Sequence, residues 1–207
     1  MIGTTARTAV IAAAAGMLLG TAPSRAEVTP EERAKLVTYL TDTRDRVLAE
    51  AETLTDQQWS FKPAPDRWSV GEVVEHLALA EPFLFDMQQK LMSGPAATAE
   101  QRAATKGKDD TLMKQIADRT QKASAPEPLQ PATRIGSRAE VLAAFKERRS
   151  RTLEYATATK DDLRSRASDS PLGAVDGYQW LLFIGAHTER HLGQIREVKA
   201  HAGFPGK

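Results

Sequence analysis

Four amphipathic stretches of the sequence each begin with a helix-capping signature, and this repeated pattern limits the chain to helical folds. In a capping box, Ser, Thr or Asp precedes Glu or Gln by three residues, and each side chain bonds the backbone N–H at the other position. Such pairs predict helix starts at Thr29, Ser69, Ser137 and Asp176. The pattern therefore predicts four long helices, and it contains almost no strand signal.

Apolar residues recur after each start at steps of three and four, as expected for the helices of a bundle. The clearest series covers residues 70–91, and the last begins at Trp180 and is expected to stop at Gly203. Pro82 falls inside the second helix and is expected to bend or interrupt it. Together these features predict an all-α four-helix bundle.

A long connection, residues 93–136, joins the second and third predicted helices. It contains "SGPAATAEQRAATKGKDD" and the proline-rich "APEPLQPATRIG", and residues 111–122 are expected to form a short helix within it. A connection of this length is unusual inside a compact domain. It allows a crossover between helices in place of a simple hairpin, and it offers a position for a mobile lid.

The first 26 residues have the parts of a signal peptide. A basic start precedes an apolar run over residues 10–20, and the small Ser24 and Ala26 are suitably placed for cleavage. We therefore divide the chain into a signal peptide, 1–26, and one domain, 27–207, and expect a bacterial protein exported to the periplasm or secreted. The run is well short of the roughly 20 residues that span a bilayer, so an uncleaved membrane anchor is the less favoured alternative.

Charge and cysteine content exclude several functions for the remaining domain. Cleavage removes two arginines and no acids, which lowers the formal net charge from +1 to −1. Such a balance gives no general attraction to nucleic acid or to an anionic membrane. The sequence contains no cysteine, which excludes disulfides, a cysteine nucleophile and thiolate metal ligands.

Three of the four histidines fall on helix faces that are expected to point into the bundle. His187 and His191 are four residues apart in "HTERHLGQI", and His76 lies beside the apolar stripe in "WSVGEVVEHLALAE". Residues at i and i+4 have Cβ atoms roughly 5–6 Å apart, so two imidazoles can reach one ion. Three neutral imidazoles suit a divalent transition metal such as Zn, Ni, Fe or Mn and leave coordination positions open. The alternative is that each histidine is an ordinary core side chain bonded to a backbone carbonyl.

The same residues carry a resemblance to a known family. "WSVGEVVEHL" and "HTERHLGQI" resemble the DinB-like superfamily of bacterial four-helix bundles, also called YfiT-like metalloenzymes, and the resemblance covers most of residues 30–203. It implies a divalent metal ion held by His76, His187 and His191. It also allows a homodimer, since relatives often form dimers.

The resemblance supports two kinds of metal-dependent enzyme acting on a small molecule. In a hydrolase the metal would activate water, and a nearby carboxylate would take the proton. In a thiol S-transferase the metal would hold a small thiolate as the nucleophile. Export disfavours the transferase, because thiol cofactors of this kind are mainly cytoplasmic. The alternative from another class is a non-catalytic protein of the cell envelope that binds a metal or a small ligand.

Three carboxylates near the histidines in sequence are weak candidates for a catalytic role: Glu72, Glu75 and Glu189. Glu72 occupies a capping-box position, which favours a structural role for it. Glu75, Glu81 and Glu189 adjoin the histidines in sequence, and any of these could instead orient an imidazole from behind. Other polar candidates are Glu81, Gln194 and Tyr178.

Overall fold

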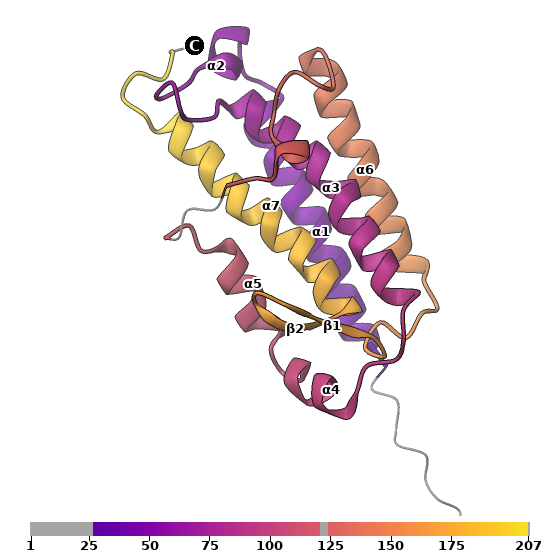
Figure 1. Ribbon diagram of the computed structural model, residues 1–207. Coiled ribbons are helices and arrows are strands. Elements are labelled where there is room, and N and C mark those ends of the chain that lie inside the picture. The colour runs from indigo at the N-terminus through magenta and orange to yellow at the C-terminus, as the bar shows by residue number, and fades with distance from the viewer. Residues whose placement is uncertain (1–26, 121–123, 207) are drawn as a thin grey trace, which may run out of the picture.

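Four long helices run side by side in the computed structural model, which describes residues 27–120 and 124–206 (Figure 1). All four begin with the predicted capping box, and the four-helix bundle predicted from the sequence is confirmed. The predicted signal peptide, 1–26, lies outside the described residues. The long helices are α1 (Pro30–Ala51), α3 (Val70–Met92), α6 (Arg138–Ala158) and α7 (Gly177–Lys199), and a short helix, α2 (Asp56–Ser60), precedes α3.

The last helix is shorter than the sequence predicts. α7 ends at Lys199, and the backbone N–H of Ala200 closes its final turn on Arg196. The predicted stop at Gly203 is wrong: the buried stripe ends at Val198, and beyond it the chain leaves the helix so that His201 and Phe204 pack against Phe61.

Pro82 does not interrupt α3, which continues unbroken to Met92. A proline has no N–H to donate to the carbonyl four residues earlier, here that of Ala78. Arg148 of α6 supplies the missing donor, with its Nη1 2.6 Å from the Ala78 oxygen. Of the two effects expected from the sequence, a bend or an interruption, the interruption does not occur, and a side chain on a neighbouring helix satisfies the freed carbonyl.

The connection between α3 and α6 contains more structure than predicted. It forms α4 (Ala99–Thr105), α5 (Asp109–Ala117) and a 3-10 helix, η1 (Glu127–Leu129). The helix expected at 111–122 corresponds to α5, which starts earlier and ends earlier. α5 lies against α7, and the chain then crosses the front of α7 and reaches α3 at η1 (Figure 1). The connection is thus a crossover that covers one face of the bundle.

A two-stranded antiparallel hairpin leads into α7 and has no counterpart in the predicted elements. Its strands are β1 (Ala167–Ser170) and β2 (Gly173–Asp176), with Ala167 paired to Asp176. Gly173 has φ 93°, a left-handed conformation that favours glycine at the turn. Asp176 ends β2 and also caps α7, so the hairpin fixes where the last helix begins.

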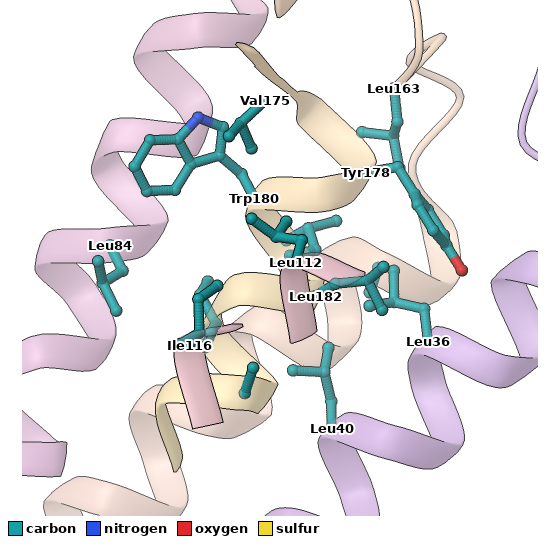
Figure 2. Packing of buried hydrophobic residues seen from close by; sticks show 14 of the residues in the cluster. Leu36, Leu40, Leu84, Leu112, Ile116, Leu163, Val175, Tyr178, Trp180 and Leu182 are labelled. Carbon is teal, nitrogen blue, oxygen red and sulfur yellow. The ribbon is translucent and has the colours of Figure 1, made fainter. Parts of the chain in front are cut away.

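Two clusters of buried apolar side chains fill the bundle, one toward each end. Figure 2 shows the first, in which Leu182 of α7 lies near Leu36 and Leu40 of α1, whereas Trp180 lies toward Val175 and Leu84. The second contains the buried apolar residues near the end of α7, including Leu192, together with the buried apolar residues in the first turns of α3. Among the helices of the described residues, none combines the length and the apolarity needed to cross a membrane.

A buried ion pair joins all four long helices. Arg149 of α6 is fully buried, and its Nε and Nη2 donate to the Glu81 carboxylate of α3 at 2.7 and 2.8 Å. Its remaining N–H groups donate to the Leu40 carbonyl and to the hydroxyls of Thr43 and Thr188. Because the acceptors lie on α1, α3 and α7 and the donor lies on α6, the network specifies how these four helices align.

Candidate metal centre

Three histidines converge where α3 and α7 lie side by side. His76 projects from α3, and His187 and His191 project from α7 one turn apart. Each offers a ring nitrogen, and these three atoms all lie within 4.8 Å of one another. The Nε2 atoms of His76 and His187 are 3.3 Å apart. Within residues 27–120 and 124–206, no other group of three histidine or carboxylate side chains converges in this way.

Backbone and side-chain acceptors fix the protonation of two of the rings. Nδ1 of His76 lies 2.7 Å from the carbonyl oxygen of Leu129, and Nδ1 of His191 lies 2.9 Å from Oε1 of Gln194. Both oxygens can only accept, so each Nδ1 carries the proton. The Nε2 lone pair of each ring is therefore left available toward the cluster. Gln194 thus makes the polar contact at the site that its sequence position suggested.

Burial keeps the three imidazoles neutral. Removal from water lowers the pKa of His76 and lowers that of His191 well below its ordinary value. Burial, with a smaller effect from the neighbouring His76, lowers the pKa of His187 to about 3. His76 and His191 are buried, whereas His187 is partly exposed. The cluster therefore presents neutral nitrogen donors near pH 7, and it reaches the surface on the His187 side.

Two aromatic rings flank the histidines. The Trp68 ring lies over those of His76 and His191, with centroid distances of 5.0 and 6.2 Å. The Phe183 ring stacks on His187 at 6.4 Å with an interplanar angle of 15°. The sequence predicts packing for Trp68 but does not predict its contact with the histidines. The only sequence feature that could have indicated this contact is the position of Trp68 directly before the cap of α3.

The candidate carboxylates all have partners elsewhere. Glu72 accepts the Ser69 N–H at 2.7 Å and pairs with Lys62 at 2.9 Å. Glu189 forms a two-pronged ion pair with Arg46 at 2.7 and 3.0 Å. Glu75 is buried and accepts three backbone N–H groups of residues 133–135. None of the three carboxylates is grouped with the histidines.

The remaining polar candidates also lie outside the cluster. Glu81 pairs with Arg149 in the buried network. The Tyr178 hydroxyl donates to the backbone oxygen of Glu32 at 2.8 Å, in the first apolar cluster. His201 follows the end of α7, and its ring packs against Phe61. The site described by the structure is therefore made of histidine nitrogens with an aromatic surround.

Comparisons with known proteins agree on a family and a fold. The model of the DinB superfamily matches residues 39–195. The uncharacterized protein YuaE of Bacillus subtilis (strain 168) is 26% identical over 152 residues, which cover 72% of this chain and 88% of YuaE. The structure of YfiT from Bacillus subtilis superposes with a TM-score of 0.57 and 17% identity, and covers 90% of this chain and 97% of YfiT.

YfiT is described as "a probable metal-dependent hydrolase with an unusual four-helix bundle topology". At 17% identity the superposition establishes a shared fold. The family match establishes membership of the family as well, because residues 39–195 include most of the bundle and His76, His187 and His191. The chain belongs to the DinB superfamily.

Proposed function

We propose that the chain holds one divalent transition-metal ion on His76, His187 and His191 and acts as a metal-dependent enzyme, with a hydrolase as the first candidate. The observation that carries the proposal is the convergence of three ring nitrogens with the His76 and His187 Nε2 atoms 3.3 Å apart. Two nitrogens bound to one zinc ion at about 2.0–2.1 Å in tetrahedral geometry lie about 3.3–3.4 Å from each other. The observed distance between these two Nε2 atoms matches that expected for two ligands of one such ion.

The donor set also fits a transition metal better than calcium or magnesium. Imidazole suits Zn, Ni or Fe, whereas Ca and Mg prefer oxygen ligands, and the cluster contains only nitrogens. Held by three imidazoles, such an ion would supply Lewis-acid chemistry, which lowers the pKa of water or polarises a carbonyl. The chain's own part is to orient the rings through Leu129 and Gln194 and to keep them neutral by burial.

The occupied carboxylates give a specific reason to keep a second candidate function. A hydrolase of the usual kind uses a carboxylate as proton acceptor, but Glu72, Glu75 and Glu189 each bond other groups. A thiol S-transferase has less need of one, because coordination to the metal would itself favour loss of the thiol proton and so supply the nucleophile. The description of YfiT as a probable metal-dependent hydrolase supports the first candidate.

The metal site is tested by metal content. Native protein purified without an affinity tag should carry close to one equivalent of a transition metal by mass spectrometry. The double variant His187→Ala, His191→Ala should lose that metal, whereas His201→Ala, at a histidine outside the cluster, should retain it. A 3.3 Å spacing also suits a hydrogen bond between two imidazoles, so native protein that stays empty after addition of zinc, nickel and manganese would refute the proposal.

The reaction is tested by screening the loaded protein against hydrolysable esters and amides and, in parallel, small thiols with electrophilic partners. Turnover of an ester that the double histidine variant lacks supports the hydrolase. Turnover that requires a thiol supports the transferase. A metal-loaded protein inactive toward both classes would favour the non-catalytic binding protein.

Export belongs to the same proposal and rests on the signal-like residues 1–26. Expressed in a bacterium, the full chain should be recovered outside the cytoplasm with a new N-terminus at Glu27. Protein that keeps Met1 and stays in the cytoplasmic fraction would contradict it.

A further inference from the structure

We infer that Glu75 is a positioning residue for the metal centre: it holds the crossover connection so that the Leu129 carbonyl orients the ring of His76. This inference rests on the proposed metal site. It concerns a carboxylate that is not grouped with the three histidines and that sequence position alone would suggest as a proton acceptor.

The Glu75 carboxylate is buried and is held by three consecutive backbone amides. Its Oε2 accepts from the N–H of Thr133 at 3.1 Å, and its Oε1 accepts from those of Arg134 and Ile135 at 2.6 and 3.1 Å. Successive N–H groups that point into one concavity form an anion-binding turn. The connection is therefore fastened to α3 by an internal carboxylate, which leaves Glu75 without a free oxygen for proton transfer.

The backbone of this turn is strained, which shows how firmly Glu75 holds it. Thr133 has φ 55°, and it is the only non-glycine residue with positive φ in the described part of the chain. A β-branched residue is a genuine outlier in the left-handed region. Such a conformation persists only where the surrounding structure over-determines it. The bonds from Thr133, Arg134 and Ile135 to one carboxylate supply that constraint.

The fastened turn lies only four residues from the atom that orients His76. The Leu129 carbonyl oxygen is 2.7 Å from His76 Nδ1, and the Leu129 side chain is buried against the first apolar cluster. Two adjacent residues of α3 therefore hydrogen-bond to one short segment of the connection. Glu75 binds the backbone of residues 133–135, and His76 binds that of Leu129. If the turn were released, the carbonyl could move away and His76 would lose the partner that fixes its proton on Nδ1.

Two variants of Glu75 and a matched control test this inference. Glu75→Ala removes the carboxylate, and Glu75→Gln keeps the shape but leaves one oxygen to accept. The control is Glu189→Gln, because Glu189 lies between two site histidines, two residues from each, but pairs with Arg46. Zinc affinity is measured by competition with a chelator. Loss of a group that supports a metal ligand typically weakens binding about 10- to 100-fold, so we expect that range for Glu75→Ala, a smaller loss for Glu75→Gln and less than about a twofold change for the control.

A second readout needs no metal. Nitrogen-15 NMR of the imidazole rings distinguishes the two neutral tautomers, and native His76 should be protonated on Nδ1. In Glu75→Ala, and to a lesser extent in Glu75→Gln, His76 should become a mixture of tautomers, while His191, held by Gln194, should stay unchanged. A purely structural role for Glu75 would lower stability without changing the His76 tautomer.

The outcomes separate this inference from the proposed function. If native protein binds zinc and both Glu75 variants bind it equally well with His76 unchanged, the positioning role is overturned and the metal site stands. If native protein binds none of zinc, nickel and manganese, the proposed function fails, and the His76 tautomer in the Glu75 variants alone decides whether Glu75 positions the ring. If Glu75→Ala does not fold, Glu75→Gln carries both readouts.

Discussion

Replacing Arg149 by methionine should lower the free energy of unfolding by about 3–5 kcal/mol, the cost of leaving one partner of a buried ion pair charged and alone. Arg149 has no exposed side-chain surface, and that of its partner Glu81 is 4% exposed. Water therefore cannot replace the two guanidinium bonds that Glu81 loses. The only donor that Glu81 retains is the Thr152 hydroxyl, at 2.8 Å.

Most of the lost free energy of unfolding should come from Glu81, because the other partners of Arg149 keep hydrogen bonds of their own. The Thr43 hydroxyl also donates to the Tyr39 carbonyl, and that of Thr188 donates to Ile184. These threonines stay hydrogen-bonded when Arg149 is removed. The double variant Arg149→Met, Glu81→Leu removes the stranded charge and should therefore lie within about 1–2 kcal/mol of the native protein, since apolar replacement of a buried pair is often near neutral.

Urea unfolding followed by circular dichroism measures these differences, with a chelator present so that metal binding adds no stability. Arg151→Met is a control on the same helix, because Arg151 pairs with Glu147 in solvent, where an ion pair contributes at most about 0.5 kcal/mol. If Arg149→Met costs less than about 1 kcal/mol, or if the double variant is as unstable as the single one, the reasoning from burial is refuted.

Three further predictions concern single positions. Because Pro82 leaves the Ala78 carbonyl to Arg148, Arg148→Met should cost about 1 kcal/mol in urea unfolding but clearly less in a Pro82→Ala background, and equal costs would contradict this. Thr133→Asn should raise the free energy of unfolding by about 1 kcal/mol, because asparagine tolerates positive φ better, and an unchanged midpoint would show that no strain is relieved. Burial raises the pKa of Asp176 to about 6, above its value of 3.8 in an unfolded chain. The favourable contribution of Asp176 to the free energy of unfolding is therefore present at low pH and is lost as pH rises through 6. Asp176→Asn should therefore gain stability relative to the native protein between pH 4 and pH 7.5, and a constant difference would refute the assignment.

Local signals predicted the bundle because each long helix carries its own start. The capping boxes lie within three residues, and sequence displays such short-range chemistry directly. Two further boxes, Thr55 with Gln58 and Thr98 with Gln101, mark the starts of α2 and α4, but neither short helix is among the predicted elements. The hairpin could not be predicted from local patterns, because its strands are four residues long and the β1 sequence, Ala-Ser-Asp-Ser, lacks the apolar alternation that marks a strand.

The histidine cluster could be predicted in part for the same reason. The spacing of His187 and His191 is a property of one helix, and only His76 had to be brought from another. Their supporting contacts could not be predicted, because they join residues far apart in the chain. Leu129 and His76 are separated by 53 positions, and Glu75 and Thr133 by 58. Which carbonyl meets an imidazole depends on the path of the crossover connection, and no local pattern encodes that path.

The positions of the glutamates show why closeness in sequence misleads on a helix and what this means for the reaction. At 3.6 residues per turn, Glu75 points about 100° away from His76, and Glu189 points about 200° away from His187. Glu72 shares the face of His76 but is used by the capping box and Lys62. A hydrolase built on this site therefore lacks a proton donor from these residues, and its rate should depend on the leaving group. Esters of acidic alcohols, whose leaving oxygen departs without a proton, should be cleaved far faster than matched amides, whose leaving nitrogen must be protonated. Equal rates on the two would show that another side chain donates the proton, and would contradict the assignment of structural roles to all three glutamates.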